Sequence, residues 1–505
     1  MKLAIVYSRA LSGIAAPLVT VEAHLSPGLP KFNIVGLPET AVKESKDRVR
    51  SAIINARFEF PGRRITINLG PADLPKEGAR FDLPIALGIL AASGQLPKER
   101  LSEYEFSGEL ALSGDLRPVN GVLPAVLAAR QAARQLVIPQ CNANEAALIE
   151  GARVLSAAHL LEVCAHLRGT EQLSICSSPP FSATATTWPD FADVKGQSHA
   201  KRAMEIAAAG RHSIILIGPP GTGKTMLASR LPGILPLLNE QEALETAAVA
   251  SVSNQGFHRS AWRQIPFRAP HHSSSSVALV GGGRPPKPGE VSLAHHGVLF
   301  LDELPEFSRH VLECLREPLE SGFITISRAA YQTIFPTQFQ FVAAMNPCPC
   351  GYAGSALDYC HCTSEQIQRY LGKISGPLLD RIDMHVSVPR LALEVLASQE
   401  KNMTVTSALV RARVEKARQL QISRQGKCNA FLSAAELDDS SDMEQEAVQL
   451  LMQVMGKYNL SARVYHRIMK LARTIADLCD QPQVTVGHMS EALNYRCLDR
   501  NKPTS

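Results

Sequence analysis

A single octapeptide constrains this chain more than any other feature. Residues 213–217 form a short apolar run, and residues 226–231 have a helical pattern. Between them lies a G-x-x-x-x-G-K-[ST] sequence, in the strand–loop–helix context that this motif requires. It comprises Gly218, Pro219, Pro220, Gly221, Thr222, Gly223, Lys224 and Thr225. The sequence therefore predicts a phosphate-binding loop in an α/β domain built on a parallel sheet.

Such a loop suits the phosphates of ATP. Its glycines let backbone N–H groups turn inward around the phosphates, and the N-terminus of the following helix adds positive potential. We expect Lys224 to reach the β- and γ-phosphates and Thr225 to ligate Mg²⁺.

Two acidic residues follow a second apolar run at residues 298–301. A parallel strand is buried on both faces, so acidic side chains belong only at its carboxyl end, beside the phosphate-binding loop. Asp302 fits the Mg²⁺ partner, and Glu303 fits the group that polarises the attacking water. Such a run alone is usually just a strand end, but together with the phosphate-binding loop it is a specific signal.

A third apolar run, residues 339–345, ends at Asn346. A polar residue at the tip of a neighbouring parallel strand could contact the γ-phosphate or the attacking water. A turn asparagine before Pro347 is the alternative, and the chemistry alone leaves both open.

The amino-acid composition limits the classes of protein to which the chain can belong. The 45% hydrophobic and 20% charged content is that of a soluble globular protein. A net charge of +5 permits a nucleic-acid partner without arguing for one. No stretch reaches the ~18 apolar residues of a membrane span, and the first ten residues do not resemble a signal peptide. We therefore expect a cytoplasmic protein without a membrane partner.

The pattern of hydrophobicity divides the chain into four segments. Residues 1–168 alternate strands and helices, and residues 169–189 have a Ser-, Thr-, Ala- and Pro-rich linker composition. Residues 190–390 form a second α/β segment, and residues 391–505 have a helical pattern. In the first segment we expect strands at 4–7, 18–25, 32–35 and 65–69, with helices at 39–55, 84–93 and 122–135. In the last we expect helices at 405–424, 443–457 and 462–478.

The order of these motifs resembles AAA+ ATPases. The phosphate-binding loop is followed by LDEL at 301–304, AMNP at 344–347 and LDRID at 379–383. The chain resembles the magnesium-chelatase-like group and, more specifically, the ComM (YifB) family. That resemblance rests on GLPE at 36–39, PADLPKEG at 71–78, APHH at 269–272 and CPCG at 348–351, and it covers nearly the whole chain. It implies an AAA+ core with a parallel sheet and an α-helical lid.

The resemblance also assigns roles to polar residues. Asn346 takes the place of the first sensor, and Arg381 that of an arginine finger reaching the ATP of the next subunit. Arg463 takes the place of a second sensor on the lid, and Arg467, one turn on, could substitute for it. A surface charge is the alternative for each arginine, and Arg381 could equally form a structural ion pair.

Two further implications concern the adenine and the assembly. Residues 193–197 resemble the segment that packs beside the adenine, which places Val194 and Gln197 there. An arginine finger that acts on the ATP of a neighbouring subunit requires an oligomer, and related proteins form hexameric rings.

The first segment resembles a Lon-type domain with the ribosomal-S5-domain-2-like fold. In its proteolytic members a lysine activates a serine nucleophile. Here Arg80 or Phe81 stands where the serine belongs, and Leu123 stands where the lysine belongs. The resemblance therefore implies a domain without the protease dyad, one that assembles the ring or contacts DNA.

Two Cys-x-Cys pairs form the one tight cysteine cluster. Cys348, Cys350, Cys360 and Cys362 could close tetrahedrally on Zn²⁺, although this spacing is tighter than usual. His361 could replace one cysteine, and reduced, uncoordinated thiols are the alternative. A metal here would stiffen a loop near the ATP site or pore.

Three other features bear on function. The pairs His271-His272 and His295-His296 suggest metal, but we expect loop or packing roles because no acidic residue or third histidine accompanies either pair. Residues 273–290, with Arg284 and Lys287, are expected to form a mobile basic loop. Residues 324–334 alternate like a hairpin. Helicase relatives carry a DNA-gripping basic residue on such a hairpin, and Arg328 matches it; an exposed charge without a partner is the alternative.

These observations favour an ATP-driven hexameric motor on single-stranded, forked or branched DNA. The ComM resemblance implies a branch-migration helicase that acts in homologous recombination and in the integration of transforming DNA. The alternative is a chelatase-like motor subunit that remodels a protein partner. A third hypothesis, an ATP-dependent protease, is disfavoured by the missing dyad.

Overall fold

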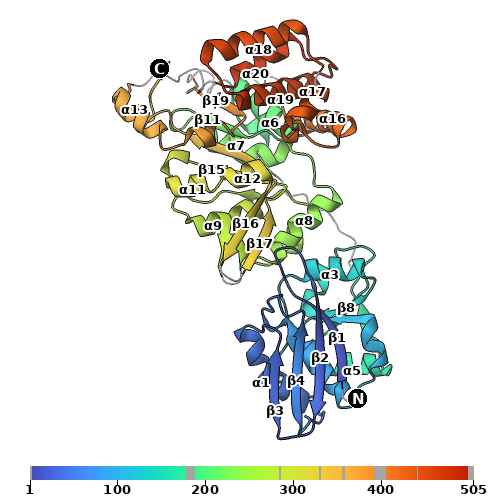
Figure 1. Cartoon of the computed structure of the whole chain (residues 1–505). Helices are drawn as coiled ribbons and strands as arrows, with labels where there is room; N and C mark the ends of the chain where they lie inside the picture. Colours follow the sequence, from blue (N-terminus) through green and yellow to red (C-terminus); the bar gives the residue numbers. More distant parts are fainter. Residues whose placement is uncertain are drawn as a thin grey trace.

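The computed structural model of the chain describes residues 3–177, 188–283, 286–328, 331–354, 359–391, 405–440, 442–496 and 498. Figure 1 shows an elongated molecule with three parts along its length: a blue N-terminal part, a green-to-yellow central part and a red helical part. No helix in these ranges is long and apolar enough to cross a membrane.

The N-terminal part is built on a mixed eight-stranded sheet of order β10-β9-β8-β5-β1-β2-β4-β3. Every residue of helix α2 is buried, because this apolar helix packs on strands β1 and β2. The elements are β1 Leu3–Arg9, β2 Leu18–Ser26, β3 Lys31–Val35, α1 Thr40–Asn55, β4 Arg64–Gly70, α2 Asp82–Ala92, β5 Tyr104–Phe106, β6 Glu109–Leu110, β7 Leu116–Arg117, α3 Val122–Gln131, β8 Gln135–Pro139, α4 Ala143–Ala146, β9 Val154–Ala157, α5 Leu160–Arg168 and β10 Ser174–Ile175.

The structure corrects one predicted helix here. The expected helix at 122–135 ends at Gln131, because Ala133 adopts a left-handed φ of 54° and Gln135 begins strand β8. Strand β10 pairs with β9, so the sheet continues into the stretch for which we expected a linker. Residues 178–187 of that stretch lie outside the described residues.

The central part contains a five-stranded sheet of order β12-β15-β18-β11-β19, in which every pair is parallel. Strands β11, β15 and β18 are buried along their whole length, as their apolar sequences predict. The elements are α6 Ser198–Gly210, β11 Ile214–Ile217, α7 Lys224–Ile234, α8 Glu240–Ser251, β12 Phe267–Arg268, α9 Ser276–Val280, β13 Gly281–Gly282, β14 Lys287–Pro288, α10 Glu290–Leu293, β15 Val298–Leu301, α11 Arg309–Glu313, α12 Arg316–Ser321, β16 Phe323–Arg328, β17 Tyr331–Pro336, β18 Gln340–Met345, α13 Ser364–Leu371, α14 Gly376–Leu379 and β19 Met384–Ser387.

The C-terminal part is helical, as predicted, and lies against helices α6 and α7 of the central part. It consists of α16 Ser407–Gln425, α17 Ala434–Ser440, α18 Gln445–Tyr458, α19 Ala462–Leu478 and α20 Val486–Asn494. Figure 1 shows these helices at the opposite end of the molecule from the N-terminal sheet.

Strands β16 and β17 form the predicted antiparallel hairpin. Its buried side chains share a core cluster with strands β11, β15 and β18, and Figure 1 shows it running from the central sheet toward the N-terminal part. The loop between β1 and β2 meets the hairpin, because a Cβ on Gly13 would lie 2.6 Å from the carbonyl oxygen of Ile334. The N-terminal part therefore contacts the hairpin directly.

Candidate functional site

The phosphate-binding loop connects β11 to α7, which begins at Lys224. The Lys224 ammonium donates to the carbonyl oxygens of Gly218 (2.7 Å) and Pro219 (2.8 Å) and to Oδ1 of Asn346 (3.1 Å). Burial lowers the pKa of Lys224, while the nearby carboxylates of Asp302 and Glu303 oppose that shift. The lysine thus lies inside the loop, where a phosphate would offer its ammonium a charged partner.

The cation-binding residues predicted from the sequence lie together. The Thr225 hydroxyl donates to Oδ2 of Asp302 over 2.7 Å, and the backbone N–H of Glu303 donates to Oδ1 of Asp302 over 2.9 Å. A hydroxyl beside a carboxylate is an all-oxygen donor set of the kind that Mg²⁺ prefers. These residues therefore fit Mg²⁺ bound together with a phosphate.

Glu303 lies in an uncommon backbone conformation with a φ of 51°. A non-glycine residue in the left-handed region is held there by its surroundings, and such positions cluster at functional sites. The Glu303 side chain is 57% exposed, and its carboxylate lies 3.5 Å from Nδ1 of His272. Its carboxylate is therefore open to solvent at the mouth of the site.

These groups line a cavity of about 360 Å³ at the carboxyl ends of neighbouring strands β15, β18 and β11. Ligands of open parallel sheets bind at this edge. The lining residues are Pro220, Gly221, Thr222, Gly223, Lys224, Thr225, Met226, Asp302, Glu303, Met345 and Asn346. Gly218 lies at the base of the loop, where an added Cβ would come within 2.1 Å of the Val388 carbonyl oxygen.

Val194 and Gln197 lie behind this cavity rather than in its lining. Val194 is buried, and Gln197 donates to the carbonyl oxygens of Thr222 (3.4 Å) and Pro389 (2.8 Å). The segment therefore braces the phosphate-binding loop against the end of the central sheet. Contact with an adenine stays a prediction.

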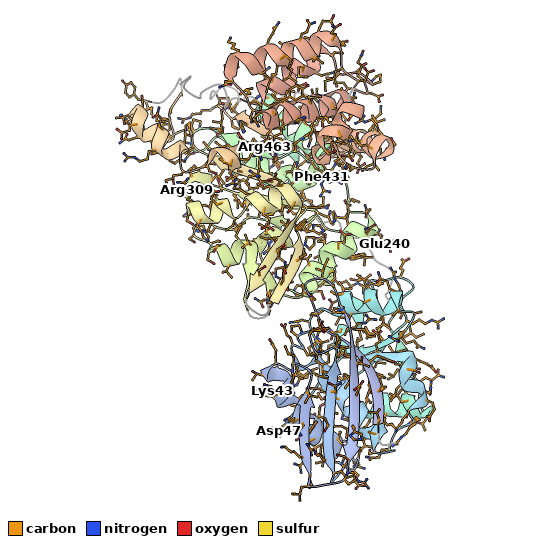
Figure 2. All side chains as sticks on the ribbon, in the orientation of Figure 1. Lys43, Asp47, Glu240, Arg309, Phe431 and Arg463 are labelled. Carbon is orange, nitrogen blue, oxygen red and sulfur yellow. The ribbon has the colours of Figure 1, made fainter. Side chains whose placement is uncertain are left out.

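The predicted arginines lie outside the cavity lining. Arg381 pairs with Glu320 through Nε (3.0 Å) and Nη2, and it also donates to the Pro377 carbonyl oxygen (2.9 Å). Only 10% of the Arg381 side chain is exposed, so in the single chain it forms the structural ion pair that the sequence left open. Arg463 is exposed, and Figure 2 shows it where the lid helices meet the central part.

Arg467 forms an ion pair with Asp383 at the start of β19. Burial alone would raise the pKa of Asp383, but Arg467 and His212 hold it well below its usual range. Asp383 also accepts from the backbone N–H and hydroxyl of Ser213, both over 2.9 Å. Arg467 thus ties the lid to the strand that precedes the phosphate-binding loop, whereas in the described part of the chain no hydrogen bond or ion pair holds the Arg463 side chain.

The expectation that no acidic residue accompanies the histidine pairs is wrong. His295 and His296 approach Oε2 of Glu245 within 3.2 Å and 2.7 Å, and His272 lies beside Glu303. Nδ1 of His295 accepts the backbone N–H of Gln338, so its Nε2 carries the proton and donates to Glu245. A metal would need the Nε2 lone pair that this proton occupies. The cluster therefore links α8 to the residues just before β15 by hydrogen bonds.

The stretch 273–290 is not a single irregular loop. It contains helix α9 and the paired strands β13 and β14, and Lys287 contacts Asn254. Arg284 lies outside the described residues. In the hairpin, the backbone of Arg328 pairs with Tyr331, the last pair before residues 329–330, which lie outside the described part.

At the positions that the dyad occupies in proteolytic Lon-type domains, this chain has buried side chains that are not nucleophiles. Phe81 and Leu123 are fully buried, and Arg80 donates to the carbonyl oxygen of Asn120 over 2.7 Å. The Lon-like assignment stays a prediction, whereas the fold around these residues is the mixed sheet described above.

The four cysteines of the predicted cluster are brought together, with all four sulfur atoms within 4.8 Å of one another. His361 is exposed and is not among them.

The sheet order, the phosphate-binding loop and the acidic pair at the adjacent strand end define a P-loop ATPase core of the AAA+ class. Residues 190–396 match the family described as magnesium chelatase, subunit ChlI, and residues 404–496 match the C-terminal part of that subunit. A third match, to subunit ChlI of Mg-chelatase, covers residues 21–142.

Comparison over the full length narrows this class. The chain is 53% identical to the competence protein ComM of Haemophilus influenzae, over 99% of this chain and 98% of that protein. It is 50% identical to the uncharacterized protein YifB of Escherichia coli, with the same coverage. The magnesium-chelatase 38 kDa subunit of Cereibacter sphaeroides is 25% identical over 31% of this chain and 52% of that protein. The chain belongs to the ComM (YifB) family of magnesium-chelatase-like AAA+ proteins.

Three residues of the site environment were missed by the sequence analysis. His272 follows β12 and meets Glu303, Glu320 binds Arg381, and Glu245 joins the histidine pair. The APHH motif was a signal for His272. Glu245 and Glu320 lie in helices among several other acidic residues, and no local pattern distinguishes them.

Proposed function

We propose that this chain is an ATP-driven motor that acts on DNA as an oligomeric ring, a hexamer by analogy with related AAA+ proteins. Its work would be branch migration during homologous recombination and the integration of transforming DNA. The 53% identity to a protein named for competence covers 99% of the chain, whereas the 25% identity to the magnesium-chelatase 38 kDa subunit covers 31%, which supports this choice over a chelatase motor subunit.

One structural observation carries the proposal. The β16–β17 hairpin lies in the chain segment that begins with Asp302 and Glu303 and ends with Asn346. Its residues Ile324, Ile326 and Phe335 share one core cluster with the two strands that carry these catalytic candidates. Packed side chains therefore connect the strands that end at the nucleotide site with the hairpin, and this connection is the route by which we propose that hydrolysis is coupled to a DNA-gripping element.

The roles within one site follow from its geometry. Lys224 would hold the β- and γ-phosphates, and Thr225 and Asp302 would hold Mg²⁺, which would supply positive charge beside the phosphates. Glu303 polarises the attacking water, and Asn346 contacts the γ-phosphate. Arg381 of a neighbouring subunit stabilises the transition state, and Arg463 on the lid reports whether the γ-phosphate is present. The N-terminal part, which we assign to the Lon-like fold, assembles the ring or guides DNA.

Arg328→Ala is expected to weaken DNA binding while leaving the basal ATPase rate unchanged. A guanidinium near the hairpin tip would pair with phosphates, and such contacts carry no base information. Binding to all sequences should weaken about equally, and the slope of log K against log salt should fall by about one per contact removed. Fluorescence anisotropy over a salt series measures both quantities.

Arg369→Ala is the matched control, because Arg369 is an exposed arginine paired with Glu365 on helix α13, which lies away from the hairpin in Figure 1. It should leave both the affinity and the slope unchanged. Wild-type unwinding of forked or four-way DNA by the Arg328→Ala variant would show that the hairpin does not grip DNA. The basic residues of 273–290 would then be the next candidates.

A further inference from the structure

The cysteine cluster has the dimensions of a metal site. Sγ of Cys348 lies 3.3 Å from Sγ of Cys350 and 3.7 Å from Sγ of Cys360, and the sulfur atoms of Cys350 and Cys360 are 3.5 Å apart. Tetrahedral Zn²⁺ with bonds of about 2.3 Å holds its sulfur ligands about 3.8 Å apart. Together with Cys362, which completes the group, the cluster matches a closed four-thiolate zinc site.

A backbone amide contacts the cluster as it would contact a thiolate ligand. The N–H of Ala353 donates to Sγ of Cys348 over 3.3 Å. Outer hydrogen bonds of this kind orient the ligands in metal sites.

The cluster is joined to the nucleotide site on one side. Cys348 follows Asn346 by two residues, and Asn346 accepts from Lys224. Gly351, between the first cysteine pair and the rest of the loop, packs on the phosphate-binding loop. A Cβ there would lie 2.7 Å from Cδ of Pro220, and the backbone has a φ of 90°. The loop that carries the first two cysteines therefore leaves no free space against Pro220.

Helix α13 closes the arrangement from the other side. It begins directly after Cys362, with Thr363 as its N-cap in a capping box. Tyr370 of this helix is buried, and its hydroxyl lies beside the backbone N–H of Asn346. A metal that joins the two cysteine pairs would therefore fix the Asn346 segment and the helix that buttresses it relative to each other.

We propose that the four cysteines bind one Zn²⁺ that holds Asn346 against Lys224 and the phosphate-binding loop. The ion has no open position for a substrate and takes no part in the chemistry. It acts through Tyr370 and Gly351, which are positioning residues for Asn346. The effect on hydrolysis rests on the proposed ATPase activity, whereas the metal site stands independently of it.

Metal analysis of protein purified reduced and without chelators tests the site, with about one zinc per chain expected. Replacement by Co²⁺ should give the d–d absorption bands of tetrahedral thiolate cobalt. Cys360→Ser should lose both, and Cys314→Ser, outside the cluster, should keep them. Wild-type protein that contains no zinc and gives no cobalt spectrum would overturn the proposal, whatever its ATPase activity.

Tyr370→Phe tests the coupling without disturbing the ligands, and it remains informative if Cys360→Ser does not fold. The variant should retain one zinc per chain and bind a fluorescent ATP analogue with unchanged Kd. Its kcat should fall roughly tenfold or more, as for other residues that orient a site from its outer hydrogen bonds. Full zinc occupancy with the wild-type kcat would show that Tyr370 does not position Asn346.

Discussion

Glu303→Gln is expected to bind ATP with near-normal affinity and to reduce hydrolysis by roughly 10² to 10⁴-fold, the range for loss of general acid–base catalysis. The amide has almost the shape of the carboxylate but cannot accept a proton from the attacking water. ATP should therefore remain uncleaved and hold the ring together. Single-turnover hydrolysis, analogue binding and light scattering measure the three effects.

Lys224→Ala is expected to impair both binding and chemistry, because it removes the ammonium that lies inside the phosphate-binding loop. It should abolish turnover and weaken ATP binding, while the fold survives.

Glu306→Gln is the matched control for Glu303→Gln, since Glu306 is an exposed carboxylate one turn beyond the site, near Lys373. A Glu303→Gln variant with normal turnover would show that Glu303 is not the water-polarising group.

Arg381→Ala is expected to act across subunits. An arginine finger contributes about 10³ to 10⁵-fold to kcat in related P-loop enzymes, so each variant subunit should silence a neighbour's site. Mixed with Lys224→Ala, which retains its own Arg381, the variant should regain activity, because a Lys224→Ala subunit can supply the finger to a neighbouring site whose Lys224 is intact. Steady-state ATPase activity across a mixing series measures this.

Arg369→Ala provides the control for that series, because Arg369 is an exposed arginine paired with Glu365 on the same helix. Mixed with Lys224→Ala, it should show only the activity that its own fraction supplies. A mixture of the two variants that stays as inactive as either variant alone would mean that Arg381 acts within its own subunit, where it already binds Glu320.

The nucleotide site was predictable because its parts are local. The phosphate-binding loop needs only eight consecutive residues, and Asp302 and Asn346 each end an apolar strand of a parallel sheet. The carboxyl ends of such strands meet at one edge, so the strand order alone brings these residues to Lys224. The hairpin was predictable for the same reason, since alternation and a short turn define it within one stretch.

Long-range pairs could not be predicted in this way. Glu320 meets Arg381 across 61 positions of the sequence, and Glu245 meets His296 across 51. Neither glutamate differs from its neighbours in any local pattern. Strand β8 was missed because the apolar stretch that precedes it continues the helical period, and only the left-handed Ala133 separates the two elements.

The central claim is that ATP hydrolysis by this chain is coupled to DNA. The most direct test measures the ATPase rate of the full chain alone and with single-stranded, duplex and four-way-junction DNA at one fixed salt concentration. We expect DNA to raise the rate, most strongly for branched DNA, and Arg328→Ala to keep the basal rate but lose the stimulation. A rate unaffected by any DNA, but raised by a protein partner, would contradict the account and favour a chelatase-like motor.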